Sequence, residues 1–309
     1  MKTAFIFPGQ ASQYVGMGSD LYNEFESVKS MFDTASNILK YDLADVCFNG
    51  PEEKLKQTAY TQPAVFLHST ALDSVLKQNN LIPDASAGHS LGEYSALVSA
   101  RALTFEQAIE AIGVRSRAMQ DDCDKVPGTM AAVIGMGYDD IVEKIKNVDG
   151  IVVPANYNSD GQVVIAGEVN AVEAACELLK ANGAKRAMPI PVGGAYHSPL
   201  MANSAEFMSD YIKNKLPLEN LSFPVYSNVE AEPESDGGRY INLLAKQIPN
   251  PVLWYTILLN MYRDGIRKFV EVGPGKVLQG LVKRSLRKPD IEIHGIDNLE
   301  ELNSFLGKL

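Results

Sequence analysis

One feature limits the folds and functions open to this chain more than any other: a serine between two glycines, where a strand-like segment meets a helix-like one. The segment Gly88 to Gly92 reads GHSLG and matches the G-x-S-x-G pattern. A strand that turns sharply into a helix leaves little room for flanking side chains, so glycine suits both outer positions. Such a turn exposes the serine hydroxyl and directs the first N–H groups of the helix toward an oxyanion. The pattern predicts a nucleophile at Ser90; because the chain has 24 glycines, an inert capping serine in a glycine-rich turn is the alternative.

Composition narrows the class of protein. A chain of 309 residues, 46% hydrophobic and 21% charged, is typical of a soluble globular protein with a sizeable core. The net charge of −10 argues against a nucleic-acid partner, which would require a basic surface. Residues 263–288 depart from this balance, with eight Lys or Arg against only Asp264 and Glu271. This basic stretch predicts a docking patch for an acidic partner or, alternatively, a solvated face.

The cysteine content and the hydropathy of the sequence indicate the cellular compartment in which the protein is expected. The three cysteines are widely spaced and odd in number, which favours neither a disulfide framework nor a metal site: Cys47, Cys123 and Cys176. The first apolar run stops at Pro8 and Gly9, so it is too short for a signal peptide. No stretch is long and apolar enough to cross a bilayer. We therefore expect a cytoplasmic protein with no membrane partner.

Strand-like and helix-like segments alternate through the chain, which indicates an α/β fold. Outside the middle third we expect strands at 3–7, 84–88, 223–228, 267–273 and 291–296, and helices at 19–40, 64–78, 105–120 and 251–265. Pro63 would occupy the first turn of the second helix. Thr104 and Gln107 resemble a capping box at the start of the third.

In residues 127–193 the predicted strands and helices follow a different order. The expected order is strand, helix, two strands, helix and strand, at 129–136, 138–147, 150–158, 161–167, 169–183 and 184–192. This βαββαβ order predicts a ferredoxin-like subdomain. We interpret it as an insertion into a larger α/β hydrolase-like domain with a parallel sheet, formed by residues 1–126 and 194–309.

A nucleophilic serine needs a base, and the chain has four histidines. His89 adjoins Ser90, so its side chain should diverge from the hydroxyl at a sharp turn. His68 lies in an apolar helical stretch and His294 in a terminal strand, and both are expected to pack structurally. His197 follows two glycines where the subdomain rejoins the main domain, so it can face a cleft between them. It is the best candidate for the base.

Six segments, in order, resemble the motifs of malonyl-CoA:acyl-carrier-protein transacylases and, more broadly, of the acyltransferase domains of fatty-acid and polyketide synthases. They are FPGQASQ, GHSLGEYSAL, RSRAMQ, NYNSDGQVVIAG, AYHSPLM and EVGPGKVLQGLVKR. The resemblance spans essentially the whole chain. It implies that a malonyl group passes from malonyl-CoA, a CoA thioester, to the phosphopantetheine thiol of acyl carrier protein through a malonyl-serine, supplying fatty-acid synthesis. It implies no metal and no redox cofactor.

The resemblance also implies catalytic roles. Ser90 would be acylated, and His197 would be its general base, held by main-chain carbonyls at the position of Gln247. An ordinary exposed glutamine is the alternative for Gln247. The backbone N–H groups of Gln10 and Leu91 would form the oxyanion hole. The next position, Ala11, departs from the family's usual glycine without removing the donor.

The resemblance also implies which residues would select the substrate. Arg115 would hold the malonyl carboxylate, because a guanidinium donates two parallel hydrogen bonds to a carboxylate; Arg117 is the competing candidate. Asn158 would line the cleft near the substrate or the catalytic histidine, although ordinary turn chemistry also explains it. Tyr196 would fill the space that an α-methyl group needs, which favours malonyl over methylmalonyl.

Three rival functions stay open. A serine hydrolase of the α/β type would place its histidine near the C-terminus, after an acid, and His197 does not fit that order. An acyltransferase that supplies a polyketide assembly line shares the same chemistry. A non-catalytic acyl-carrier scaffold would not need serine, histidine and arginine together.

Overall fold

The computed structural model describes residues 1–307, and its main sheet carries the candidate nucleophile. Six strands lie in the order β10-β9-β1-β2-β7-β8, all parallel except the last. Their bounds are β1 Lys2–Phe7, β2 Ala85–Gly88, β7 Val225–Tyr226, β8 Pro233–Glu234, β9 Ile266–Val272 and β10 Glu292–Ile296. Phe7 and Gly88, the last residues of β1 and β2, are paired. The loops after these two strands therefore leave the same edge of the sheet side by side.

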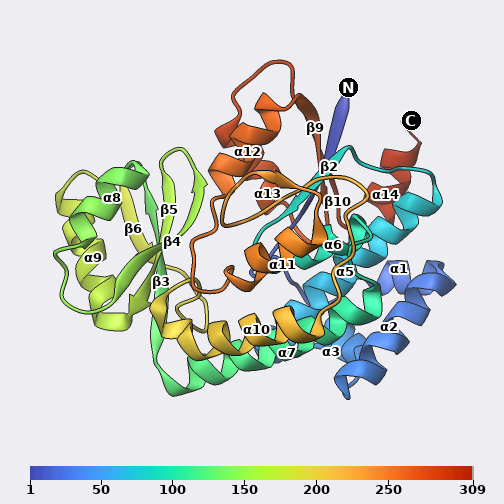
Figure 1. Cartoon of the computed structure of the whole chain (residues 1–309), viewed down its shortest axis with the longest axis horizontal. Coiled ribbons are helices and arrows are strands. Elements are labelled where there is room, and N and C mark those ends of the chain that lie inside the picture. The colour runs from blue at the N-terminus through green and yellow to red at the C-terminus, as the bar shows by residue number, and fades with distance from the viewer. Residues whose placement is uncertain (308–309) are drawn as a thin grey trace.

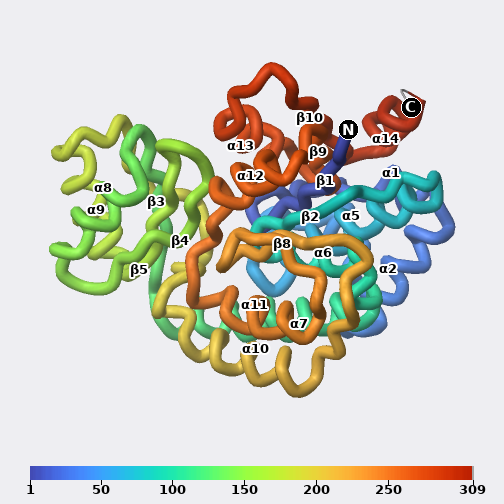
Figure 2. Tube along the Cα trace, turned by 45° about the horizontal axis from the view of Figure 1, so that its top comes forward, coloured from blue at the N-terminus to red at the C-terminus, as the bar shows by residue number. Residues whose placement is uncertain are grey.

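Helices cover both faces of this sheet (Figures 1 and 2). They are α1 Ser19–Glu24, α2 Glu26–Leu39, α3 Leu43–Asn49, α4 Glu52–Leu55, α5 Thr58–Gln78, α6 Gly92–Ser99, α7 Phe105–Lys125, the short 3-10 helix Pro199–Met201, α10 Ala202–Lys215, α11 Gly237–Ala245, α12 Trp254–Arg263, α13 Val277–Ser285 and α14 Leu299–Leu306. Alternate residues of β1 enter two separate cores: Phe5 and Phe7 on one face, Ala4 and Ile6 on the other. A strand buried on both faces reads as a continuous apolar run, as this one does.

The predicted insertion forms a second, antiparallel sheet in the order β4-β5-β3-β6. Its elements are β3 Gly128–Ile134, α8 Tyr138–Ile145, β4 Val152–Ser159, β5 Gln162–Glu168, α9 Val169–Ala181 and β6 Arg186–Pro189. This confirms the βαββαβ order, and the lobe has an apolar core of its own. The domain limits at residues 126/127 and 193/194 stay a prediction, and residues 308–309 of the last segment lie outside the described part.

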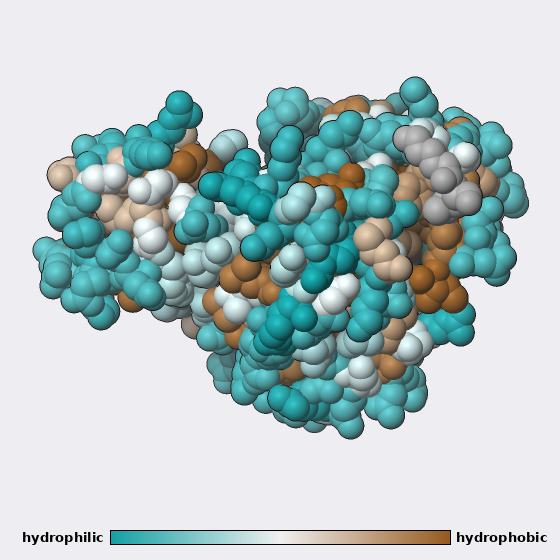
Figure 3. Space-filling model, turned by 90° about the horizontal axis from the view of Figure 1, so that it is seen from above, coloured by the Kyte–Doolittle hydropathy of each residue, from teal (hydrophilic) through white to brown (hydrophobic). Residues whose placement is uncertain are grey.

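Two helices join the lobes. α7 leads into the small lobe and α10 leads away from it, and the two pack together below the main sheet (Figure 1). Seen from above, the surface is largely hydrophilic and is notched between the two lobes (Figure 3). No helix among residues 1–307 is both long and apolar enough to span a membrane.

The structure corrects two predicted helices. The helix expected at 64–78 begins at Thr58, so Pro63 lies inside it rather than in its first turn. The carbonyl that Pro63 cannot bond, four residues earlier at Ala59, accepts instead from the Tyr41 hydroxyl at 3.3 Å. The helix expected at 19–40 is broken at Phe25, whose backbone is extended. The capping box of Thr104 and Gln107 is confirmed.

Candidate active site

The turn that carries Ser90 depends on close backbone contact. Ser90 has a φ of +50°, in the left-handed region that costs an L-residue energy. A Cβ added at Gly88 would lie 1.8 Å from the carbonyl carbon of Gly92, and one added at Gly92 would lie 2.2 Å from the carbonyl oxygen of Phe7. Only glycine fits either position. This confirms the predicted strand–turn–helix unit and gives the physical reason for both glycines.

His197 lies against the candidate nucleophile. Its Nε2 is 2.8 Å from Oγ of Ser90, and its Nδ1 donates toward the carbonyl oxygens of Asn250 at 3.0 Å and Gln247 at 3.2 Å. Because Nδ1 faces two acceptors, it carries the hydrogen and leaves Nε2 as the acceptor for the serine proton. Burial lowers the pKa of His197 to about 3, and the nearby charge of Arg115 adds to this effect. The imidazole is therefore neutral at physiological pH.

Arg115, on α7, lies on the other side of the serine hydroxyl. It is fully buried, and its Nη2 donates to Oγ of Ser90 at 3.1 Å and to Oε1 of Gln247 at 2.9 Å, while Nη1 donates to Oε1 of Gln62 at 2.6 Å. Among residues 1–307 it forms no ion pair with a carboxylate. Arg117 is exposed and lines a separate surface groove. The geometry brings Arg115, and not Arg117, to Ser90.

Two backbone N–H groups belong to the segments that meet at the Ser90 turn, and Gln10 lines the same cavity as Ser90. Leu91 directly follows Ser90, and Gln10 lies in the loop after β1, next to the turn. Within the described chain neither N–H has a hydrogen-bond partner. Unpaired N–H groups beside a nucleophile are suited to stabilise an oxyanion. Ala11 has a φ of +73°, a conformation that favours glycine, the residue that the resemblance implies at this position.

Gln247 is buried rather than exposed, which excludes the alternative of an ordinary surface glutamine. Its side chain contacts Arg115, and its Nε2 donates to the carbonyl of Ser90 at 2.8 Å and to Oε2 of Glu93. Glu93 and Asn228 were missed from the sequence. Asn228 accepts from the N–H of Ser90 at 2.7 Å and donates to the carbonyl of Gly88 at 2.7 Å, so it clamps the turn. The available signal for Asn228 was a polar residue at the carboxyl end of the strand predicted at 223–228.

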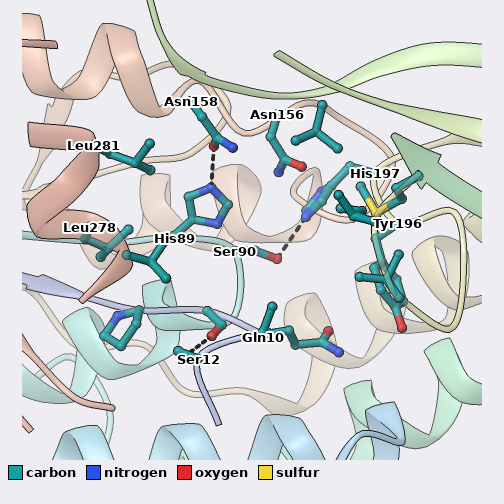
Figure 4. A pocket seen from close by; sticks show the side chains of 18 residues that line it. Gln10, Ser12, His89, Ser90, Asn156, Asn158, Tyr196, His197, Leu278 and Leu281 are labelled. Atoms are coloured by element: carbon teal, nitrogen blue, oxygen red, sulfur yellow. Dashed lines mark hydrogen bonds between the residues drawn. The ribbon is translucent and has the colours of Figure 1, made fainter. Parts of the chain in front are cut away.

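A cavity of about 190 Å³ opens above Ser90 and is lined from both lobes (Figure 4). Asn156 and Asn158 enter it from β4, and the apolar Leu278 and Leu281 enter it from α13. Asn158 bonds Nε2 of His89 at 2.9 Å, so it contacts the histidine beside the nucleophile and not His197.

Tyr196 closes one side of this cavity (Figure 4). Its hydroxyl lies 2.6 Å from Oγ1 of Thr58, which fixes the ring in place. No group of three or more His, Cys, Asp or Glu side chains placed to hold a metal ion occurs among residues 1–307.

A serine held at the end of a parallel strand, with a neutral imidazole on one side and a buried cation on the other, is suited to acyl transfer through a serine ester. Comparison with known proteins agrees with this class. The family model described as "Acyl transferase domain" matches residues 4–304. The malonyl CoA-acyl carrier protein transacylase of Staphylococcus aureus is 40% identical over 307 residues, covering 98% of each chain.

Solved structures extend the comparison. An acyl carrier protein S-malonyltransferase from Vibrio cholerae superposes with a TM-score of 0.93 at 40% identity, covering 99% of this chain and 100% of that one. A malonyl-transacylase solved in complex with a type II PKS acyl-carrier protein gives a TM-score of 0.94 at 38% identity, covering 100% of both chains. The chain belongs to the acyl transferase domain family and, within it, to the malonyl CoA-acyl carrier protein transacylases.

Proposed function

We propose that this chain transfers the malonyl group of malonyl-CoA to the phosphopantetheine thiol of acyl carrier protein, through an ester on Ser90. One observation carries the proposal: Oγ of Ser90 lies within hydrogen-bond distance of both the His197 imidazole, at 2.8 Å, and the Arg115 guanidinium, at 3.1 Å. A base and a cation at one hydroxyl match a nucleophile that must attack an acyl group bearing a carboxylate. The related transacylases support the same activity.

In the first step, Oγ of Ser90 attacks the thioester carbonyl while Nε2 of His197 takes the hydroxyl proton. The carbonyl oxygen becomes an oxyanion, which the N–H groups of Gln10 and Leu91 stabilise. Losing one such donor typically costs about 3 kcal/mol in the barrier. The C–S bond then breaks, and CoA leaves as a thiol with the proton from His197. Ser90 now carries the malonyl ester.

In the second step, the phosphopantetheine thiol gives its proton to His197 and attacks the ester carbonyl. The C–O bond to Ser90 breaks, and His197 returns the proton to the serine oxygen. Both steps balance with side chains and substrates alone, so we propose that no cofactor takes part.

Arg115 supports selection for malonyl. Its buried guanidinium has no carboxylate partner of its own among residues 1–307, so the substrate carboxylate would supply one. An acetyl group leaves the cation unpaired, which costs about 1.5–3 kcal/mol for a hydrogen bond to a charged group. Asn158 and Tyr196 would shape the rest of the cavity, Tyr196 by filling the space of an α-methyl substituent.

The basic stretch predicted from the sequence contributes exposed side chains near the far end of a helix that lines this cavity. Lys283 and Arg287 are exposed near the end of α13, the helix whose Leu278 and Leu281 line the cavity. We propose that this helix end receives the acidic carrier protein. A cytoplasmic location is part of the proposal, since its three free thiols suit a reducing compartment.

A transfer assay tests this function. Purified protein, malonyl-CoA and phosphopantetheinylated carrier protein are mixed, and malonyl-carrier and free malonate are both quantified by mass spectrometry. The proposal expects malonyl-carrier to form and Ser90→Ala to abolish it. Release of malonate without malonyl-carrier would instead identify a hydrolase. Repeating the assay with fatty-acid and polyketide carrier proteins identifies which assembly line is supplied; the similarity to a transacylase bound to a type II PKS carrier favours including the second.

A further inference from the structure

Two buried side chains, Glu93 and Gln247, lie behind the Ser90–Arg115 pair. Both are 1% exposed. Glu93, on α6, accepts at Oε1 from the Tyr240 hydroxyl at 2.6 Å and from the N–H of Asn228 at 3.3 Å, and at Oε2 from Nε2 of Gln247. Every oxygen of this carboxylate is therefore used, and one of them faces the amide that contacts Arg115.

The amide of Gln247 has a donor end and an acceptor end, and its surroundings allow only one orientation. Nε2 faces two acceptors, the carboxylate of Glu93 and the carbonyl of Ser90, while Oε1 faces the Nη2 donor of Arg115. If the amide were reversed, Oε1 would face two acceptors and Nε2 would face a guanidinium. Each of these contacts would be repulsive and buried, where unpaired polar groups are costly.

We propose that Glu93 is a positioning residue: it fixes the amide of Gln247, which in turn holds Arg115 toward the carboxylate of the acyl group. This inference rests on the proposed role of Arg115 in binding that carboxylate. It predicts an effect that depends on the substrate. Loss of Glu93 should reduce use of an acyl group with a free carboxylate, such as malonyl, more than use of an uncharged one, such as acetyl. A glutamate that only stabilises the fold would affect both equally.

Glu93→Gln tests the inference at constant shape. The oxygen of the new amide would accept from Tyr240, and its NH₂ group would then oppose Nε2 of Gln247 and drive that amide to reverse. We expect the ratio of kcat/KM for malonyl-CoA over acetyl-CoA to fall roughly tenfold. Asp73→Asn is the matched control. Asp73 is also buried, and its carboxylate accepts from the Ser99 hydroxyl and pairs with Lys77, away from the cavity lining. An unchanged ratio in Glu93→Gln, or an equal fall in the control, would overturn the inference.

A double-variant comparison gives a second test that does not depend on the stability of the single variant. Gln247→Leu removes the amide through which Glu93 is proposed to act, and Glu93→Gln is then added to that variant. If Glu93 acts through the amide of Gln247, the added substitution should leave the malonyl-to-acetyl ratio within about twofold of Gln247→Leu alone. A further fall of roughly tenfold in the double variant would contradict the inference.

The variant Arg115→Ala distinguishes a failure of the inference about Glu93 from a failure of the proposed carboxylate-binding role of Arg115. If Arg115→Ala leaves the malonyl-to-acetyl ratio unchanged, the carboxylate-binding role of Arg115 is wrong. If it lowers the ratio and Glu93→Gln does not, only the role of Glu93 is wrong.

Discussion

Phe7 and Gly88 are paired at the ends of two neighbouring parallel strands, and this pairing brings the loop of Gln10 beside the turn of Ser90. The second glycine of the turn lies directly over the carbonyl of Phe7, because a Cβ at Gly92 would approach that oxygen to 2.2 Å. We infer that backbone contact sets the spacing between the proposed oxyanion donor, the N–H of Gln10, and the proposed nucleophile, Ser90.

Gly92→Ala should push these two segments apart. Overpacking of this kind typically costs about 1–3 kcal/mol of stability, and a displacement of about 1 Å between reacting groups costs roughly 100-fold in rate. We expect both a lower Tm and a kcat for malonyl transfer reduced by about that factor. Gly137→Ala is the control, since the nearest atom to its Cβ would be 3.5 Å away, on Asp140. Normal turnover in Gly92→Ala would show that the contact does not set the spacing.

The pH dependence of acylation should reflect a buried base. Burial lowers the pKa of His197 to about 3, so the neutral, proton-accepting form predominates throughout the range from about pH 5 to 8. Burial raises the pKa of Glu93 to about 7, so the test uses acetyl-CoA, whose binding does not depend on Arg115. In single-turnover experiments with acetyl-CoA, the acylation rate should be flat over this range. A rate that halves near about pH 6.5, the ordinary value for histidine, would contradict a buried neutral imidazole.

The same shift in pKa makes the stability of the fold depend on pH. The direction of the change follows from which state, folded or unfolded, binds the proton. Below about pH 6.5 the unfolded chain binds a proton at His197 that the folded chain does not bind. This residue therefore contributes a loss of stability as the pH falls from the ordinary histidine value toward the folded-state pKa of about 3.

Ala11 stands at a position where the resemblance to the family implies glycine, and its backbone conformation has a consequence for stability. Its φ of +73° costs an alanine about 1–2 kcal/mol, whereas glycine adopts that conformation freely but loses about 0.4–1 kcal/mol through the entropy of the unfolded chain. We expect Ala11→Gly to raise the free energy of unfolding by about 0.5–1 kcal/mol, measured by urea denaturation. Destabilisation by Ala11→Gly would mean that the entropy of the unfolded chain outweighs the relief of backbone strain.

Charge reversal at the end of α13 tests the proposed carrier surface. Lys283→Glu with Arg287→Glu should raise the KM for carrier protein by roughly tenfold at low salt, with a smaller effect at high salt. Acylation of Ser90 by malonyl-CoA should stay within about twofold of wild type. Lys213→Glu with Lys215→Glu on α10, both exposed, changes the net charge equally and is the control. If carrier kinetics are the same in the double variant and in wild type, the docking surface lies elsewhere.

Local patterns in the sequence predicted the segments that depend on local physics. The G-x-S-x-G turn, the Thr104–Gln107 capping box and the βαββαβ lobe all follow from short-range spacing. The break at Phe25 and the position of Pro63 inside α5 were not predictable in the same way. Pro63 is accommodated because the Tyr41 hydroxyl, on another segment, bonds the carbonyl that the proline leaves free.

The residues of the candidate site also fall into a group that the sequence predicted and a group that it did not. Ser90, His197 and Arg115 lie in motifs, and the structure brings them together. The residues that hold them in place were not predictable from the sequence: Gln62, Glu93 and Asn228 act through side-chain hydrogen bonds to segments far away in the chain. Such contacts depend on tertiary packing, which spacing along the chain does not contain.

The most direct test of a serine-bound intermediate is the intact mass of the protein after brief incubation with malonyl-CoA in the absence of carrier. We predict one malonyl adduct on the wild-type chain, located on Ser90 by peptide mapping, and none on Ser90→Ala. An adduct that persists in Ser90→Ala, or that maps to another residue, would contradict the claim that this hydroxyl carries the acyl group.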